Sequence, residues 1–144
     1  MPGPSLINVS VKCEYALRAV LDLAVEGSGE PIRIADIAAR RKIPQKFLET
    51  ILSDLRKQGF LESRRGAEGG YLLGRPADTI TVGEILRAVE GGHNGASSEE
   101  AGPLDFLWTK VDAAIAEVID HKTIAELAWE WRERQTQFAP NWEI

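Results

Sequence analysis

Apolar residues recur at helical spacing in three successive segments of the N-terminal half of the chain. The first predicted helix is strongly apolar and ends near Gly27. A second, short helix is built around Ile34, and a third starts at Pro44 and stops at Gly59. A tight basic turn separates the second helix from the third, so the pattern predicts a helix-turn-helix. The inward positions of the third helix are predicted to be Phe47, Leu48, Ile51, Leu52 and Leu55.

Two short strands with a glycine-rich connection follow the third helix. Residues 60–65 and 71–73 read as the strands, and residues 66–70 as a loop in which glycine supplies positive backbone angles. Arg64 and Arg65 lie at the rim of this hairpin. The alternative is a loop that cradles a nucleotide phosphate, but no Gly-Lys-Ser/Thr sequence follows. The order of elements is that of a winged helix-turn-helix, which makes DNA the first candidate partner.

The outward polar residues of the third helix are candidates for reading DNA. In a helix-turn-helix, the N-terminal residues of the second helix of the motif reach base edges in the major groove. Glu49 could instead only offset its basic neighbours. An arginine on a hairpin tip can enter a narrow minor groove. The predicted DNA-binding set is therefore Gln45, Lys46, Glu49, Thr50, Arg64 and Arg65.

The charge of the chain is unevenly distributed along its length. Residues 33–75 carry ten Lys or Arg against five Asp or Glu, whereas residues 76–144 carry five against thirteen. The net charge of −5 at pH 7 therefore conceals a basic segment of +5. Such a segment neutralises phosphates, which is the main sequence-independent source of DNA affinity. A solvated helix face, the usual reason for a charge run, accounts less well for an excess confined to this segment.

A second apolar pattern lies in the C-terminal part of the chain. Its stripe is of the heptad kind and runs over about four turns, more than a wing domain of this size would need to cover. We therefore expect this helix to pair with a second copy, and packing within its own subunit is the alternative. Trp129 and Trp131 face nearly opposite ways on a helix, so at least one is expected to reach the partner. The stripe consists of Leu104, Leu107, Trp108, Val111, Ile115, Val118 and Ile119.

Composition excludes several other classes of protein. The 144 residues, 44% of them hydrophobic, suffice for one compact domain with an extra helical element. The single Cys13 cannot form an internal disulfide, and no apolar run approaches the ~20 residues that span a bilayer. We expect a soluble, cytoplasmic protein without membrane contact. It is not expected to be an enzyme, because no nucleophile with a base and no carboxylate pair is recognisable.

Several dense motifs lie between residues 10 and 90. They include Tyr15-Ala-Leu-Arg-Ala-Val-Leu-Asp-Leu-Ala24, Ile34-Ala-Asp-Ile-Ala38, Leu55-Arg-Lys-Gln-Gly59, Gly69-Gly-Tyr-Leu-Leu-Gly74 and Ile80-Thr-Val-Gly-Glu-Ile85. With them the chain resembles the Rrf2 family of bacterial winged-helix transcription regulators. The resemblance implies a homodimer on pseudo-palindromic double-stranded DNA. It also implies DNA contacts by Lys46, Glu49, Thr50 and Arg65, and a phosphate contact by Lys12.

The chain departs from the family at its sensor. Family members that bind an iron–sulfur cluster carry three cysteines in the loop before the pairing helix, whereas residues 91–102 contain none. We therefore expect no cluster, no other cofactor and no metal site, with His93, Glu99 and Glu100 as a weak alternative set of ligands. Cys13 lies at the start of the first helix, where a lowered thiol pKa and oxidation sensing are conceivable. We expect a buried or merely tolerated cysteine, and the redox-active thiol is the alternative.

The last residues form a predicted extended tail, because Pro140 stops any helix. A free carboxylate behind one aliphatic side chain suits capture by backbone amides. The tail is similar to the Ile-terminated tails by which serine acetyltransferase docks into cysteine synthase, and the cluster-free cysteine-metabolism repressors of the family end in Ile too. We hypothesise that Trp142 and Ile144 bind cysteine synthase. A tail that folds back onto its own dimer is the alternative.

The expected fold is mainly α with a small β-hairpin. It comprises a winged helix-turn-helix domain at 6–90, a flexible loop at 91–103, a dimerisation helix and C-terminal helix at 104–137, and a tail at 138–144. The expected function is that of a dimeric, sequence-specific transcriptional repressor that lacks an iron–sulfur cluster and acts with cysteine synthase on sulfur metabolism. The alternatives are a scaffold of the same fold, or a redox or small-molecule sensor that uses Cys13 or a dimer pocket.

Overall fold

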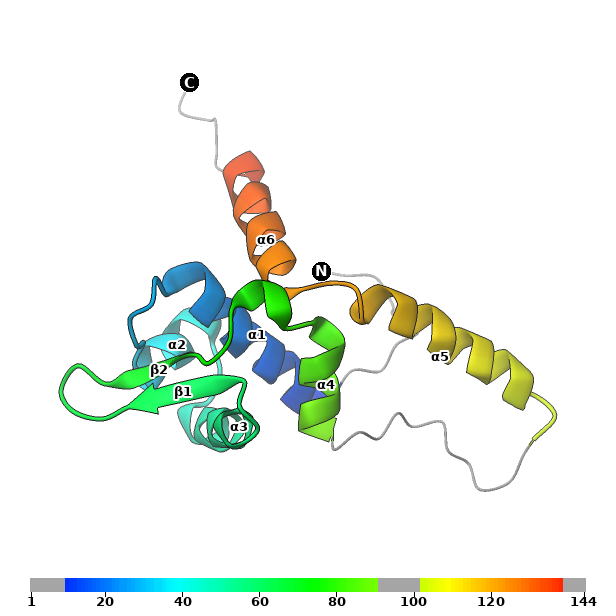
Figure 1. Ribbon diagram of the computed structural model, residues 1–144, viewed down its shortest axis with the longest axis horizontal. Coiled ribbons are helices and arrows are strands. Elements are labelled where there is room, and N and C mark those ends of the chain that lie inside the picture. The colour runs from blue at the N-terminus through cyan, green and yellow to red at the C-terminus, as the bar shows by residue number, and fades with distance from the viewer. Residues whose placement is uncertain (1–9, 91–101, 139–144) are drawn as a thin grey trace.

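The computed structural model describes residues 10–90 and 102–138, and their side chains as far as residue 136 (Figure 1). Within these ranges the chain is mainly α-helical with one small antiparallel hairpin, which confirms the predicted fold class. The elements follow in the order α1 (Val11–Glu26), α2 (Ile34–Arg41), α3 (Gln45–Lys57), β1 (Leu61–Arg64), β2 (Gly70–Leu73), the short 3-10 helix η1 (Ala77–Thr79), α4 (Val82–Glu90), α5 (Asp105–Ile119) and α6 (Ile124–Phe138).

The core forms where α1 packs against α2, α3, α4 and α6. Ser10 caps the start of α1 by accepting a hydrogen bond from Cys13 N at 3.1 Å. The helix ends at Gly27, as predicted, and the Gly27 N–H donates to Leu23 O. Burial of aliphatic side chains from each helix is the main stabilising term of this unit. The fully buried members are Ala16, Ala19, Val20, Ile37, Leu48, Leu52, Leu55, Ile80, Ile85 and Ile124.

One buried carboxylate fixes α2 against α1. Asp22 has no exposed surface, and Arg40 donates to its two oxygens at 2.9 and 3.0 Å. Arg41 donates to Asp22 Oδ1 at 2.6 Å, and its guanidinium lies 5.9 Å from the ring centroid of Trp131 on α6. A buried carboxylate is tolerated only with such charged partners. The hydrogen bond to Asp22 also raises the pKa of Arg40.

The turn between α2 and α3 is tight, as predicted. Lys42 adopts a left-handed conformation (φ 58°) and ends α2, and the buried Ile43 N donates to Ala38 O at 3.0 Å. Phe47 was predicted to face inward, and this is only partly right. Its side chain is 39% exposed and meets Tyr15 edge-on at a centroid distance of 5.4 Å. Phe47 therefore lies at the rim of the core, whereas its neighbour Leu48 is fully buried.

The hairpin is tied to the start of α2 as well as to itself. β1 and β2 pair antiparallel from Leu61 opposite Leu73 to Arg64 opposite Gly70. Ile32, which lies two residues before α2, exchanges two backbone hydrogen bonds with Tyr71, both 2.8 Å long. The segment ahead of α2 therefore pairs with β2 through this one antiparallel bridge. Gly70 has φ 151°, and a Cβ at this position would overlap with the Ile32 backbone. The wing therefore has a fixed position relative to the helix-turn-helix.

The C-terminal helices are arranged very differently from each other. α6 packs on α1, and Arg132 on α6 donates to Val25 O at 3.0 Å. In contrast, α5 extends away from the body of the molecule and has no buried residue (Figure 1). None of the helices in the described part of the chain is both long and apolar enough to span a bilayer.

Candidate nucleic-acid interface

The first turns of α3 present the predicted reading residues to solvent. Leu48, Ile51 and Leu52 are buried on the inner face of the helix. Because helix periodicity places the remaining positions on the opposite side, the polar residues point outward. Within the described part of the chain, none of these side chains makes a hydrogen bond or an ion pair. The exposed set consists of Gln45, Lys46, Glu49 and Thr50.

The two predicted wing arginines lie beside each other at the end of β1. Arg64 is the last residue of β1, and Arg65 begins the turn that leads to β2. Gly66 has φ 102° and Gly69 N donates to Gly66 O at 3.0 Å, which closes the turn. Both arginines are exposed and make no ion pair within the described residues. They are free to neutralise phosphates or to enter a groove.

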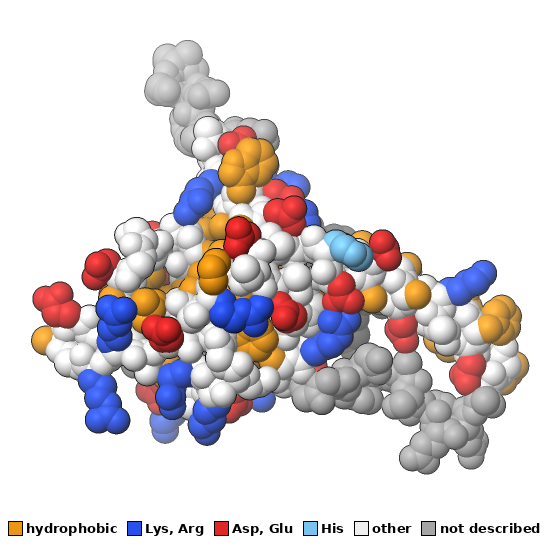
Figure 2. Space-filling view, in the orientation of Figure 1, with side chains coloured by type: hydrophobic (Ala, Val, Ile, Leu, Met, Phe, Trp, Pro, Cys, Tyr) orange, Lys and Arg blue, Asp and Glu red, His pale blue; other side chains and the backbone are white. Residues whose placement is uncertain are grey.

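The basic residues of segment 33–75 divide into two groups. Arg40, Arg41 and Arg75 form ion pairs with Asp22, Glu26 and Glu84, all of which lie outside the segment. The interpretation of all ten as one phosphate-binding patch was therefore wrong for these three, since their charge is used to hold helices together. The others make no ion pair within the described part, and blue side chains gather along the edge below the hairpin and α3 (Figure 2). This second group is Arg33, Lys42, Lys46, Arg56, Lys57, Arg64 and Arg65.

Sequence reasoning missed four exposed cations of this group, and the first of them, Arg33, directly precedes α2. Lys42 lies in the turn between α2 and α3, and Arg56 and Lys57 lie in the last turn of α3. Their positions in the turn and at the helix end were a usable signal, because the ends of a recognition helix lie near the DNA backbone. The predicted Lys12 is in the first turn of α1 and is half-buried. Within the described residues, no hydrogen bond or ion pair connects it to α3 or the hairpin.

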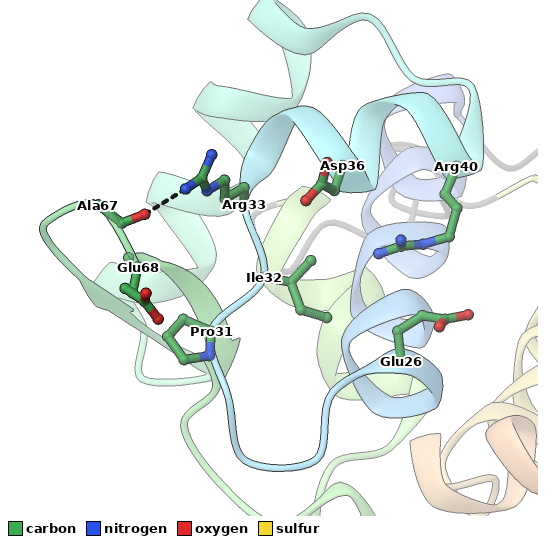
Figure 3. A pocket seen from close by; sticks show the side chains of 9 residues that line it. Glu26, Pro31, Ile32, Arg33, Asp36, Arg40, Ala67 and Glu68 are labelled. Carbon is green, nitrogen blue, oxygen red and sulfur yellow. Dashed lines mark hydrogen bonds between the residues drawn. The ribbon is translucent and has the colours of Figure 1, made fainter.

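A cavity of about 390 Å³ separates the hairpin turn from α2. Arg33 crosses its edge and donates to Ala67 O in the turn at 2.5 Å (Figure 3). This bond and the Ile32–Tyr71 bridge hold the wing against the start of α2 from two sides. The lining brings together charges of both signs but no nucleophile with a base, so it offers no catalytic set. The lining residues are Glu26, Pro31, Ile32, Arg33, Asp36, Arg40, Ala67, Glu68 and Gly69.

Cys13 is buried, and the idea of a lowered thiol pKa was wrong. The pKa of Cys13 is raised to about 11. The largest cause is desolvation by burial, and the second is the hydrogen bond to Glu90 Oε2 at 3.0 Å. The Coulombic effect of Lys12 lowers the pKa, but burial outweighs it. Since the thiolate is the reactive species, Cys13 is the buried, unreactive cysteine that was expected.

The apolar stripe of α5 is largely uncovered. Trp108 and Val118 are 52% and 64% exposed, and Phe106, which was not in the predicted stripe, is 70% exposed. Leu104, Leu107 and Val111 are exposed as well. Ile115 and Ile119 are half-buried, and Ile119 packs against the core. The alternative in which this helix packs wholly within its own subunit was therefore wrong for most of the stripe.

The two tryptophans of α6 have different surroundings, as their spacing predicted. Trp129 is 61% exposed, whereas Trp131 is half-buried beside Arg41. The Trp131 Nε1 is buried and has no hydrogen-bond partner within the described part of the chain. Other predicted features lie outside the described residues, namely the metal alternative His93, Glu99 and Glu100, and the partner-binding residues Trp142 and Ile144.

The helix-turn-helix, the hairpin beside it and the exposed cations on both define a winged-helix DNA-binding protein. A sequence profile of the Rrf2 family, described as an iron-dependent transcriptional regulator, matches residues 9–130. The chain therefore belongs to the Rrf2 family of transcription regulators. The family and its relatives are regulators and not enzymes.

Three proteins illustrate how close these relatives are. The HTH-type transcriptional regulator IscR of Erwinia tasmaniensis is 36% identical over 129 residues, which cover 84% of this chain and 78% of the relative. The structure of IscR from T. potens superimposes with a TM-score of 0.79 at 34% identity, covering 90% of this chain and 92% of the other. The structure of CymR, the global cysteine regulator of B. subtilis, gives 0.78 at 34% identity, covering 87% and 98%.

The burial of Cys13 leads to a testable expectation for thiol reactivity. At pH 8 a thiol with a pKa of about 11 is a thiolate in roughly one molecule in a thousand, so a disulfide reagent should react with it only slowly in the folded protein. In a Ser63→Cys variant, the new thiol on exposed β1 should react at once. Rapid reaction of Cys13 in the parent chain would contradict its burial.

The same raised pKa affects stability at high pH. Because the folded-state pKa lies above the ordinary value of 9.0, the protonated thiol contributes its full stabilisation below pH 9 and loses it as the pH approaches 11. Denaturant titrations of the parent and of Cys13→Ser measure this. The difference between the two proteins should change only between these pH values.

Proposed function

We propose that this protein is a homodimeric, sequence-specific transcriptional repressor whose two copies of α3 enter successive major grooves. The observation that carries the proposal is the group of exposed cations on α3 and the wing that make no ion pair within the described part of the chain. Charges that serve only the fold are paired, as Arg40 and Arg41 are with Asp22. The unpaired group therefore has phosphates as its natural partner.

The roles of individual residues follow from their positions on these elements. Lys46 can donate to guanine, Glu49 can accept from cytosine N4, and Thr50 can contact a thymine methyl group, with Gln45 at the start of the helix beside them. Arg64 and Arg65 reach the minor groove or its phosphates from the wing. Lys12 is assigned a phosphate contact at the start of α1.

We expect Arg65→Ala and Lys46→Ala to weaken DNA binding by roughly tenfold each, which corresponds to about 1.4 kcal/mol and lies within the range of about 1–3 kcal/mol for a lost groove contact. Arg134→Ala, which removes an exposed cation from α6, is the matched control and should leave the affinity unchanged. Fluorescence anisotropy with duplexes selected by the protein from a random pool measures the affinities. The logarithm of the affinity should fall with the logarithm of the salt concentration, with a slope of about −0.9 per phosphate contact.

A scaffold of the same fold that does not bind DNA is the competing function. It predicts that no duplex is enriched from the random pool, or that binding is independent of salt and equal in all three variants. Such a result would remove the regulator proposal, because electrostatic binding without salt dependence is physically inconsistent.

Pairing of the subunits is assigned to α5. A helix that leaves most of a heptad-type stripe exposed is suited to packing against a second helix of the same kind, and a contiguous exposed apolar patch marks an interaction site. The apolar stripe runs along a single protruding helix, so two copies of the chain can bury their stripes against each other about a two-fold axis. This would place the two copies of α3 on half-sites about 34–36 Å apart.

We expect Val111→Asp to dissociate the dimer, because it places a charge in the middle of the apolar stripe. Ala113→Asp puts the same charge on the opposite side of α5 and should leave the dimer intact. Analytical ultracentrifugation at several concentrations measures the mass. A monomeric parent protein, or the reverse order of the two variants, would contradict pairing through this stripe.

We also propose that the protein works without a cysteine-ligated iron–sulfur cluster, although its family is described as iron-dependent. Such a cluster needs several thiolates, and the sequence contains only Cys13, whose thiol is buried and donates to Glu90. Within the described ranges, no three His, Cys, Asp or Glu side chains lie close enough together to hold a metal. The residues present do not fit the group.

A link to cysteine metabolism is supported by the likeness to CymR, which is described as a global cysteine regulator. We propose that the segment containing Trp142 and Ile144 binds cysteine synthase. Deletion of Ile144 should abolish association with cysteine synthase in a pull-down or by calorimetry, whereas Asn141→Ala should not. Unchanged binding after the deletion, or none by the intact protein, would refute this part of the proposal.

A further inference from the structure

A short backbone joint connects the segment between α5 and α6 to the start of α4. Val82 N donates to Lys122 O at 2.9 Å, and Ile124 N donates to Ile80 O at 2.8 Å. Thr81 and Thr123 therefore lie opposite each other in an antiparallel bridge between two segments far apart in the sequence. The first segment leads into α4 of the DNA-binding domain, and the second lies between α5 and α6 (Figure 1).

Both helix starts at this joint are fixed by the same kind of cap. Thr81 N donates to Glu84 Oε1 at 3.0 Å, and Glu84 N donates back to Thr81 Oγ1 at 3.1 Å. Thr123 and Glu126 repeat the arrangement at 2.9 and 3.0 Å. Each reciprocal pair satisfies two amides that a helix start would otherwise leave unbonded. The bridge thus joins two well-defined helix starts into one unit.

A two-pronged ion pair connects the end of α5 to α4 across this unit. Arg87 on α4 donates to both oxygens of Asp120, at 2.6 and 3.0 Å, and Asp120 caps the end of α5. The Asp120 carboxylate also lies against the first turn of α4, because Gly83 has no side chain there and a Cβ would overlap with Asp120 Oδ1. The hydrogen bond from Arg87 lowers the pKa of Asp120, so the pair stays charged at neutral pH.

The geometry of α5 makes this joint mechanically important. The helix has fifteen residues and a length of about 22 Å at 1.5 Å per residue. It has no buried residue, and Ile119 in its last turn packs against the core. A tilt of about 10° at the joint would move the far end of such a helix by about 4 Å. That is close to the rise of about 3.4 Å per base pair along DNA.

We propose that the Arg87–Asp120 ion pair, seated on Gly83, sets the angle between α5 and the DNA-binding domain and thereby determines which half-site spacing the dimer accepts. The inference rests on the proposed function, because a spacing exists only if α5 joins two copies. Arg87 and Asp120 act here as positioning residues, since they orient α3 through α4 and are not assigned any DNA contact.

The distance between the two wings of a dimer tests the angle directly. A nitroxide attached to Ser63→Cys, on exposed β1, in a Cys13→Ser background gives one interspin distance across the two-fold axis by pulsed electron resonance. The parent should give a narrow distance distribution. Arg87→Gln, Asp120→Asn and Gly83→Ala should each broaden or shift it, although each acts from a different side of the joint.

Glu14→Gln is the matched control, because it removes another half-exposed ion pair, with Arg18 at 3.1 Å, within α1 and away from the joint. Its distance distribution should be that of the parent. If the three joint variants also retain the parent's distribution, the ion pair does not set the angle. If the parent gives no dipolar signal at all, the pairing of subunits fails, which is a different failure that removes the inference with it.

Binding to duplexes of altered spacing tests the consequence. The parent should prefer its selected duplex over duplexes with one base pair added to or removed from the spacer by about tenfold, since both copies of α3 must reach their grooves. The joint variants should lower this preference to less than about threefold while their affinity for an isolated half-site stays that of the parent. A purely structural defect would instead lower the affinity for every duplex, including the half-site, and would overturn the proposal.

Discussion

Asp22 has no exposed surface, and two guanidinium groups from the end of α2 converge on its carboxylate. Loss of both guanidinium partners would leave the buried Asp22 charge without solvation, and breaking a buried ion pair in this way typically costs about 3–5 kcal/mol. The cluster fixes where α2 ends on α1, and therefore where the turn at Lys42 starts α3. Through the guanidinium of Arg41 it also contacts Trp131. The orientation of the predicted recognition helix thus depends on charges that are paired with each other and not on the cations of α3 and the wing.

Ion pairing also separates the cations that hold the fold together from those that are available to bind phosphates. Cations that orient helices are paired with carboxylates from α1 and α4, whereas those on α3 and the hairpin turn have no carboxylate partner in the described part of the chain. The wing is held by backbone hydrogen bonds between Ile32 and Tyr71 and by Arg33, so its position does not depend on Arg64 or Arg65. A surface of this kind can bind phosphates without rearranging the fold that supports it.

The two C-terminal helices differ in how they are held to the rest of the molecule. α6 is fixed on α1, while α5 is attached mainly through its last turn and leaves its apolar stripe uncovered. The joint that connects the segment between these two helices to α4 combines a backbone bridge, two capping boxes and an ion pair, all of which resist bending. A pairing helix that is rigidly attached can transmit the position of one DNA-binding domain to the other, and this is what a reader of two half-sites requires.

The sequence by itself determined the helices, the tight turn, the hairpin and the apolar stripe of α5, because these features follow from spacings of three, four or two residues and from glycine and proline. It also indicated the outward residues of α3. Only the tertiary structure decided which charges were available, since Asp22 and Arg40 lie eighteen positions apart and meet only when α1 packs on α2. The burial of Cys13 against Glu90 and the contact of Arg87 with Asp120 arise in the same way. Local periodicity cannot encode such pairs, because their distance depends on how helices cross and not on how each one is formed.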